Sequence, residues 1–326
     1  MNRPDEQQPH DAALQPAPRW AVDAERHILL ITHTGRSEAR DAARKVAHWL
    51  GAAGIGVHVL AAETGGDGFG SDVHVFDDPG KAAEDCELIV VLGGDGTLLR
   101  GAELAREAEI PLLGVNMGRV GFLAEAELED LHEVVGRVVE QRYAVEERMT
   151  LDVTVLSGGV EIGRTWALNE ASVEKRCRER MLEVLVEIDG RPLSRWGCDG
   201  VVCATPTGST AYAFSGGGPV VWPEVEALLL VPISAHALFA RPLVAAPTSL
   251  LAVELEDTAP PPGQPAADGS GVLWCDGRRT IDLPAGARVE VRRGEHPVRL
   301  ARLRDAPFTD RLVAKFALPV DGWRAR

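Results

Sequence analysis

The stretch Gly93–Thr97, with the sequence Gly-Gly-Asp-Gly-Thr, combines residue types that suit phosphate chemistry. It follows Leu88–Leu92, a short apolar run rich in β-branched residues, which predicts a buried parallel strand. Glycines allow positive φ angles and a close approach of a ligand to the main chain, and free amides at a helix start attract phosphate. Phosphate repels Asp95, so we expect that carboxylate to accept a proton from an attacking hydroxyl group. An ordinary Asp-Gly turn is the alternative interpretation.

A second polar stretch, residues 198–215, is dense in hydroxyl groups. Its apolar run at 201–204 predicts a strand, and a Pro/Gly turn and a short helix follow. Thr207 and Thr210 offer hydrogen bonds to phosphate or ribose, and Tyr212 offers a flat face. For Ser209 alone, a cap at the start of the helix is the better interpretation.

The neighbouring Asn169 and Glu170 side chains suit the vicinal diol of a ribose. We expect them to end a strand, before a charged loop at 174–180. For this pair alone, a polar strand end is the simpler explanation. His236 is similarly explained as a packed or capping histidine, and Asp276-Gly277 as a hairpin turn.

Composition restricts the class of protein. With 45% hydrophobic and 25% charged residues, the 326-residue chain is typical of soluble globular proteins with an ample core. A net charge of -15 argues against general binding to nucleic acid or to an anionic membrane. Five cysteines without a Cys-x-x-Cys pair fit a reducing cytoplasm rather than a disulfide framework or zinc site. We find no signal peptide, and no apolar run is long enough to span a membrane.

The order of the predicted elements divides the chain into two domains. Strands and helices alternate over 26–142, which predicts an α/β domain with a parallel sheet. Residues 143–300 instead predict a series of strands and hairpins, and therefore a β-rich second domain. We expect a disordered tail over 1–25, a flexible insertion over 259–271, and a C-terminal segment, 301–326, that returns to the first domain and contains a helix at 308–316.

Taken together, these motifs resemble those of bacterial NAD kinases over roughly residues 27–323. The Gly-Gly-Asp-Gly-Thr motif is shared with phosphofructokinases and lipid kinases, whereas Asn-Glu combined with Thr-Pro-Thr-Gly-Ser-Thr-Ala-Tyr at 205–212 is far more specific. The remaining matching segments are Asn116-Met117-Gly118, Gly121-Phe122-Leu123, Asp199 onward, Pro232-Ile233-Ser234 with His236, Arg241-Pro242 and Asp276-Gly277.

The resemblance implies phosphorylation of the adenosine-ribose 2′-hydroxyl of NAD, in an active site between the two domains. It implies Asp95 as proton acceptor, a phosphate-donor loop of Gly93, Gly94, Gly96 and Thr97, and NAD contacts from Asp95, Gly96, Arg100, Phe122, Asn169, Glu170, Arg180, Asp199, Thr207, Thr210, Ala211, Tyr212, Ala213, Phe214 and Ser215. Arg278 stands where many members have a ligand-contacting glutamine, and Gly197 where some have a basic residue. Neither is assigned a role.

The family resemblance also implies partners. The donor is ATP or polyphosphate with a divalent metal, usually Mg²⁺, for which no ligand is assigned in the sequence. A homodimer or homotetramer is implied, with a neighbouring subunit completing the dinucleotide site. Two alternatives stay open: a kinase for a sugar phosphate or lipid, and a catalytically silent dinucleotide sensor. An assay for NADP formation separates them.

Overall fold

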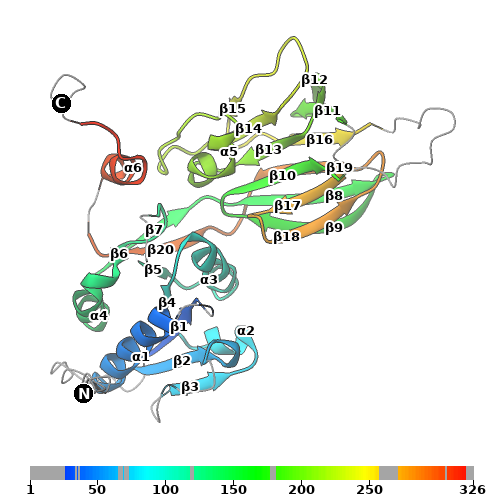
Figure 1. Ribbon diagram of the computed structural model, residues 1–326. Helices are drawn as coiled ribbons and strands as arrows, with labels where there is room; N and C mark the ends of the chain where they lie inside the picture. The colour runs from blue at the N-terminus through cyan, green and yellow to red at the C-terminus, as the bar shows by residue number, and fades with distance from the viewer. Residues whose placement is uncertain are drawn as a thin grey trace, which may run out of the picture.

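The protein is described here from a computed structural model (Figure 1). The structure describes residues 26–33, 35, 37–64, 69, 73–117, 121–176, 181–256, 271–304 and 307–320. The expected disordered tail, most of the expected insertion, and Arg180 lie outside the described residues.

The N-terminal domain is built on a mainly parallel sheet. Within the described part of the chain, eight strands form it in the order β3-β2-β1-β4-β5-β20-β7, with β6 beside β5. Only β7 runs antiparallel to its neighbour, β20. The strands are β1 (His27–Thr32), β2 (Gly56–Leu60), β3 (Val73–Phe76), β4 (Leu88–Leu92), β5 (Leu112–Asn116), β6 (Ala126–Glu127), β7 (Ala144–Arg148) and β20 (Val298–Arg302).

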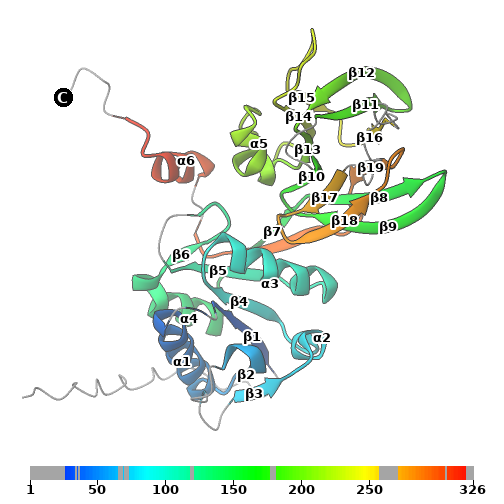
Figure 2. The ribbon, with the colours of Figure 1, turned by 45° about the vertical axis from the view of Figure 1, so that its right-hand side comes forward.

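Helices cover both faces of this sheet (Figure 2), so β4 is apolar throughout and β1 is apolar between His27 and Thr32. One face packs against α1 (Ser37–Ala52) and α4 (Leu131–Val139), and the other against α2 (Pro79–Ala83) and α3 (Asp95–Glu107). The apolar face of α1 includes Ala42, Val46, Trp49 and Leu50, and all four residues are buried against the sheet. The sequence missed β3 and β7. Because β7 pairs with β20, the N-terminal sheet extends past the expected boundary at 143.

The C-terminal domain consists of two antiparallel sheets with an apolar core between them. Residues alternate between core and surface along strands such as β8, which explains the period of two in the sequence. Over the described ranges, one sheet has the order β15-β14-β13-β10-β17-β18 and the other β12-β11-β16-β19-β8-β9. The bounds are β8 (Leu151–Ser157), β9 (Val160–Ala167), β10 (Glu170–Lys175), β11 (Leu182–Ile188), β12 (Arg191–Cys198), β13 (Gly200–Ala204), β14 (Leu228–Ile233), β15 (Leu243–Ala245), β16 (Leu251–Leu255), β17 (Gly271–Cys275), β18 (Arg279–Leu283) and β19 (Arg288–Arg293).

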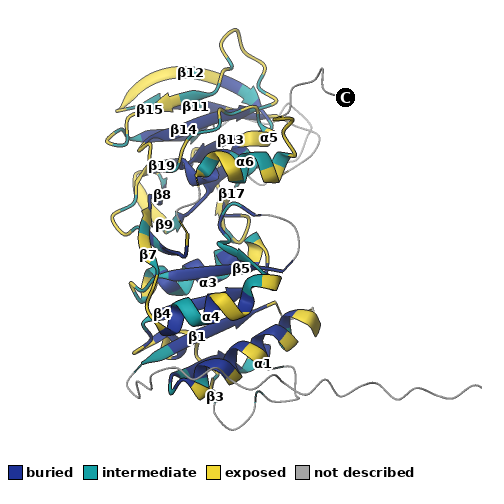
Figure 3. Ribbon diagram, turned by 90° about the vertical axis from the view of Figure 1, so that its left-hand side faces the viewer, coloured by how far each residue is buried: buried dark blue, intermediate teal, exposed yellow. Residues whose placement is uncertain are grey.

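The two remaining α-helices of the described chain are α5 (Tyr212–Ser215), beside the sheets of the second domain, and α6 (Phe308–Phe316), which follows β20 of the N-terminal sheet. Figure 3 shows the strands of both domains largely buried, and exposed surface on α6 and β12. No helix within the described ranges is both long enough and apolar enough to cross a membrane.

The parallel sheet with its helices and the two antiparallel sheets confirm the expected α/β domain and β-rich domain.

Candidate active site

The Gly93–Thr97 turn lies where the strand order of the N-terminal sheet changes direction, between β1 and β4. Ligands of open α/β sheets bind at this point, outside the carboxyl ends of the strands. A pocket of about 440 Å³ is present here. It is lined by His33 after β1, by Gly93, Gly94, Gly96, Thr97 and Arg100 at the start of α3, and by Arg278 from the second domain. The structure therefore brings together the expected donor-loop residues and Arg100.

None of the glycines of this turn is needed for a positive φ angle, which corrects the sequence-based expectation, and only Gly93 is needed for close packing. Gly94 is extended, with φ -93° and ψ -174°, and none of the turn's glycines is in the left-handed region. A Cβ atom on Gly93 would lie 2.6 Å from the Oγ1 atom of Thr97. The amide of Gly93 donates to Val115 O, whereas those of Asp95 and Gly96 begin α3 and lack an intrahelical acceptor.

Asp95 is the first residue of α3, with a half-exposed side chain. Its Oδ1 atom is buried without a hydrogen-bond partner and lies 2.4 Å from the position that a Cβ on Gly121 would occupy. Gly121 is therefore required for this carboxylate to fit. Burial raises the pKa of Asp95, and the Lys315 ammonium, 3.9 Å from Oδ2, partly opposes that rise. A carboxylate with a raised pKa and an unused oxygen is well suited to accept a proton.

The Asn169-Glu170 pair forms a sharp corner between β9 and β10, and it begins β10 rather than ending a strand as expected. The buried Asp276 carboxylate holds this corner. It accepts hydrogen bonds from the amides of Leu168 (2.9 Å), Asn169 (2.7 Å) and Glu170 (3.3 Å). Asp276 is thus much more than the hairpin-turn residue that the sequence suggested.

Arg279 links this corner to the helix that carries Asp95. Its Nη2 atom donates to Asp276 Oδ2 at 2.8 Å, and its Nη1 atom to Glu103 on α3 at 3.0 Å. Arg278 binds the same glutamate from Nε at 3.0 Å. Trp166 lies between the guanidinium groups of Arg106 and Arg279, 4.5 and 4.3 Å from its ring. The two domains therefore meet along α3.

The Thr205–Tyr212 turn packs directly on the corner. Thr205 donates from its amide to Asn169 O (2.9 Å) and from its hydroxyl to Leu168 O (2.6 Å). Gly208 is required here, because a Cβ would lie 2.0 Å from Asn169 O. The amide of Tyr212 donates to Glu170 Oε2 at 3.3 Å, so the expected residues Glu170 and Tyr212 are neighbours. Ser209 is structural, but it bonds the main chain of Val221 instead of capping a helix.

Glu170 is kept in an unfavourable environment for a charge. Burial, and next the charge of Asp276, raise its pKa from the usual 4.5 to about 7. The pKa of Glu170 is higher in the folded protein than in the unfolded chain, so the folded state favours the protonated side chain. The stability that this protonation contributes is fully present below pH 4.5 and is lost as the pH rises through about 7.

We therefore expect Glu170→Gln to be more stable than the parent protein at pH 8, with a difference on the order of 3 kcal/mol or less that shrinks toward pH 5. Thermal unfolding at several pH values measures this. Glu183→Gln, an exposed change on β11, is the matched control. A stability difference for Glu170→Gln that does not depend on pH would contradict this account.

The aromatic residues of α6 join candidate NAD-binding residues of both domains. Phe316 stacks on Phe214 of α5 at 4.8 Å and lies 5.9 Å from Phe122, between ring centroids. Phe308 lies 5.8 Å from Phe122. Since Lys315 also faces Asp95, α6 lies next to Asp95 as well as next to Phe122 and Phe214.

Other expected residues lie elsewhere or serve packing. Asp199 forms an ion pair with Lys175, the last residue of β10, whereas Glu170 is the first residue of that strand. At about 3.3 Å per residue, the two ends of β10 lie roughly 15 Å apart. The Ala213 side chain is buried in a small core cluster, and exposed His236 pairs its main chain with Gly197. The Thr210 hydroxyl donates to Thr207 O at 3.3 Å. Ala211 follows Thr210 and directly precedes α5, and Ser215 is exposed at the end of that helix.

Four residues that lie here had no role predicted from the sequence: His33, Asp276 as a structural support, Arg278 and Lys315. The position of His33, directly after the first strand, was an available signal, because ligands bind at the carboxyl ends of such strands. Nothing in the local sequence placed Arg278 or Lys315 beside the Gly93–Thr97 turn and Asp95, since both come from distant parts of the chain.

This fold and site define a class: a two-domain α/β phosphotransferase whose phosphate-binding turn carries a carboxylate. The chain matches the family models described as ATP-NAD kinase N-terminal domain, over residues 28–143, and ATP-NAD kinase C-terminal domain, over residues 168–303. The chain belongs to the NAD kinase family, and the resemblance found in its motifs is confirmed.

Its relatives include NAD kinase 2 of Streptomyces avermitilis, 62% identical over 92% of this chain and 97% of that protein. The NAD kinase of Thermobifida fusca is 62% identical over 92% of each chain, and that of Mycobacterium leprae is 53% identical over 93% of this chain and 98% of the relative. These relatives favour an NAD kinase over a sugar-phosphate or lipid kinase.

Two solved structures share the fold. A yeast NADH kinase complexed with NADH superposes with a TM-score of 0.83 at 23% identity, covering 93% of this chain and 90% of its own. An NAD kinase from Archaeoglobus fulgidus in complex with ATP has a TM-score of 0.66 at 25% identity, covering 89% of this chain and 98% of its own.

Proposed function

We propose that this protein transfers the γ-phosphoryl group of ATP to the 2′-hydroxyl of the adenosine ribose of NAD, giving NADP and ADP. The position of Asp95 carries the proposal: its partnerless, buried oxygen lies at the helix start that also lines the phosphate pocket. Asp95 takes the hydroxyl proton, and the ribose oxygen forms a bond to the γ-phosphorus. The bond between that phosphorus and the oxygen bridging to the β-phosphate breaks, and ADP leaves.

The donor site is the pocket at the Gly93–Thr97 turn. The amides at the start of α3 place partial positive charge where a triphosphate would bind. Arg100, which is ion-paired with Glu63, and Arg278, which is ion-paired with Glu103, line the same pocket. The relative from Archaeoglobus fulgidus, solved with ATP, supports ATP as the donor. Polyphosphate offers the same repeating phosphates and is a second candidate donor.

The acceptor site is the corner at Glu170 together with the turn that packs on it. Glu170 and Asn169 would bind the ribose diol, and Tyr212 its adenine, with Phe122, Phe214 and the other expected residues around them. The yeast relative, solved with NADH, supports a dinucleotide in this role. Arg180 stays a candidate on the resemblance alone.

Mg²⁺ is the proposed metal. Among the described residues there is no group of three or more His, Cys, Asp or Glu side chains that could hold a metal ion. Mg²⁺ is usually held by one or two carboxylates and by substrate phosphates, so the proposal needs only a carboxylate beside the donor. Asp95 would be the carboxylate nearest the donor. When bound, the ion would neutralise charge on the phosphates.

We also propose that the protein is a cytoplasmic homodimer or homotetramer. Asp199 lies far from Glu170 within one chain, so it would contribute to the dinucleotide site of a neighbouring subunit. The cysteines Cys86, Cys198, Cys203 and Cys275 are free and buried, which fits a reducing compartment. Light scattering on the purified protein measures its assembly.

The deciding experiment follows NADP formation from NAD, with ATP and polyphosphate tested in parallel and Mg²⁺ present. We expect NADP with ATP, and none with either donor when NAD is omitted. A protein that binds NAD but forms no NADP with either donor would instead be a dinucleotide sensor, and the proposed reaction would be wrong.

A further inference from the structure

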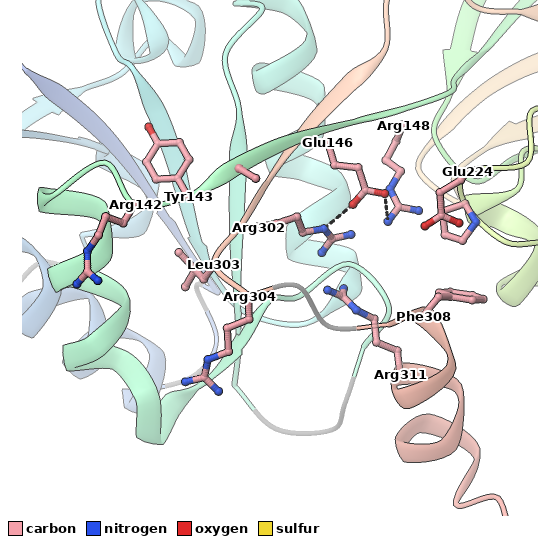
Figure 4. A pocket seen from close by; sticks show the side chains of 12 residues that line it. Arg142, Tyr143, Glu146, Arg148, Glu224, Arg302, Leu303, Arg304, Phe308 and Arg311 are labelled. Atoms are coloured by element: carbon pink, nitrogen blue, oxygen red, sulfur yellow. Dashed lines mark hydrogen bonds and ion pairs between the residues drawn. The ribbon is translucent and has the colours of Figure 1, made fainter.

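A second, basic pocket of about 620 Å³ lies between the β7–β20 edge of the N-terminal sheet and α6 (Figure 4). It shares no lining residue with the pocket at the Gly93–Thr97 turn. Five of its lining residues are arginines, although the whole chain has a net charge of -15. They are Arg142, Arg148, Arg302, Arg304 and Arg311.

Three of these arginines converge at the inner end of the pocket, where Figure 4 shows their guanidinium groups pointing toward one another. Arg302 binds Glu146 at 2.7 Å and Glu125 at 2.9 Å. Arg148 also binds Glu146, at 2.9 Å, and Arg311 also binds Glu125, at 2.7 Å. Three positive charges thus share two carboxylates, which leaves one positive charge without compensation. Glu224, on the pocket wall, is exposed.

The excess charge is accompanied by unused hydrogen-bond donors. The side chains of Arg148 and Arg302 are only 7% and 9% exposed. Within the described structure, Arg148 Nε and Arg302 Nη2 are nevertheless buried without a partner. Burial, followed by the charge of Arg302, lowers the pKa of Arg148 to about 10. Buried donors of this kind are normally satisfied, so their state requires an explanation.

We propose that this pocket binds a polyanion bearing phosphate groups, outside the site of phosphoryl transfer. Two oxygens of one phosphate group accept two parallel N–H bonds from a guanidinium group, and the negative charge of the phosphate offsets the excess positive charge at the arginines. The volume lies within the range of small-molecule sites, so several linked phosphates fit better than one. An inorganic polyphosphate and the phosphates of NADP offer this same chemistry.

The bound anion would also act on the catalytic side of α6. Arg311 donates from Nη1 to Phe122 O at 3.1 Å, and Glu125 accepts hydrogen bonds from the amides of Leu303 and Arg304, at 3.1 Å each. The arginine cluster therefore connects α6, the loop at Phe122 and β20. An anion that bridges Arg148, Arg302 and Arg311 would fasten these segments together and raise the melting temperature.

The test variant is Arg148→Gln. It leaves two arginines facing two carboxylates, so the variant should fold without losing thermal stability. The matched control is Arg164→Gln, an exposed change on β9 that alters the net charge equally. Thermal unfolding and titration calorimetry are run without Mg²⁺ or NAD, using inorganic phosphate, tripolyphosphate and NADP as separate ligands. Anions that bind at the Gly93–Thr97 turn should stabilise the parent protein and both variants equally. The second pocket is therefore measured by the difference in anion binding between the parent protein and Arg148→Gln.

We expect tripolyphosphate or NADP to raise the melting temperature of the parent protein and of Arg164→Gln by equal amounts, and that of Arg148→Gln by less. The affinity of this second site should fall at least tenfold in Arg148→Gln. The ligand that shows this difference identifies the source of the phosphates. Equal shifts in all three proteins with every ligand would overturn the proposal. If Arg148→Gln fails to fold, Arg311→Gln tests the same charge balance, with the same outcomes.

Discussion

Replacing Asp95 with asparagine should lower kcat by about 10²–10⁴-fold, the usual contribution of a general base. The amide has nearly the same shape but cannot accept the proton of the attacking hydroxyl group. Asp95 Oδ1 has no hydrogen bond to lose within the described structure, so Asp95→Asn should retain the fold and much of its affinity for NAD. Steady-state kinetics, with thermal unfolding alongside, measure both effects.

The control for this change is Asp41→Asn, an exposed substitution on α1 that should leave kcat as it is. The pH profile adds a second readout. Because burial raises the pKa of Asp95, the parent kcat should fall as the pH drops through that raised value, and this limb should be absent from the residual activity of Asp95→Asn. Near-parental kcat in Asp95→Asn would remove the residue from the role of base.

The sequence predicted the elements that local chemistry determines. The hairpin around Ser157–Gly159 is confirmed, because Gly158 and Gly159 have the positive φ angles that such a turn needs. The Asp189-Gly190 hairpin is confirmed for the same reason. The helix expected at 308–316 has those bounds in the structure. In each case a short run of residues contains all the information that the element requires.

Elements determined by distant contacts were missed. Strand β10 contains Ser172, Glu174 and Lys175, which made the region resemble a charged loop, yet it pairs with both β13 and β17. Strand β14 was not predicted either: it contains Pro232, which has no N–H group to donate, but four other residues pair it with β13. Tertiary pairing overrides local propensity at both places.

The candidate site shows the same division. The sequence identified Asp95 and Glu170, because their neighbours suggested phosphate and ribose chemistry. It could not identify the support of these residues, since Asp276 and Arg279 reach the corner and α3 from the β17–β18 hairpin, more than one hundred residues away in the chain. A buried carboxylate with three amide donors can be recognised only once the strands are placed together.

Replacing Asp276 with asparagine should therefore have the largest effect on stability, a loss of about 2–3 kcal/mol in the free energy of unfolding. Asparagine tolerates the positive φ of 54° at this position, so backbone strain is not the cause. Its amide group would instead face one of the buried N–H groups of the corner, and the ion pair with Arg279 would be lost.

The same substitution should raise KM for NAD more than KM for ATP, because Asp276 holds the Asn169-Glu170 corner, whereas the donor pocket lies at the start of α3. Denaturant unfolding and initial rates at varied NAD and ATP measure the two effects. Asp282→Asn is the matched control, an exposed change on the same hairpin that should alter stability by no more than about 0.5 kcal/mol. If Asp276→Asn matched Asp282→Asn in both stability and KM for NAD, the corner would not depend on the buried carboxylate, and the binding site of the ribose would have to be sought elsewhere.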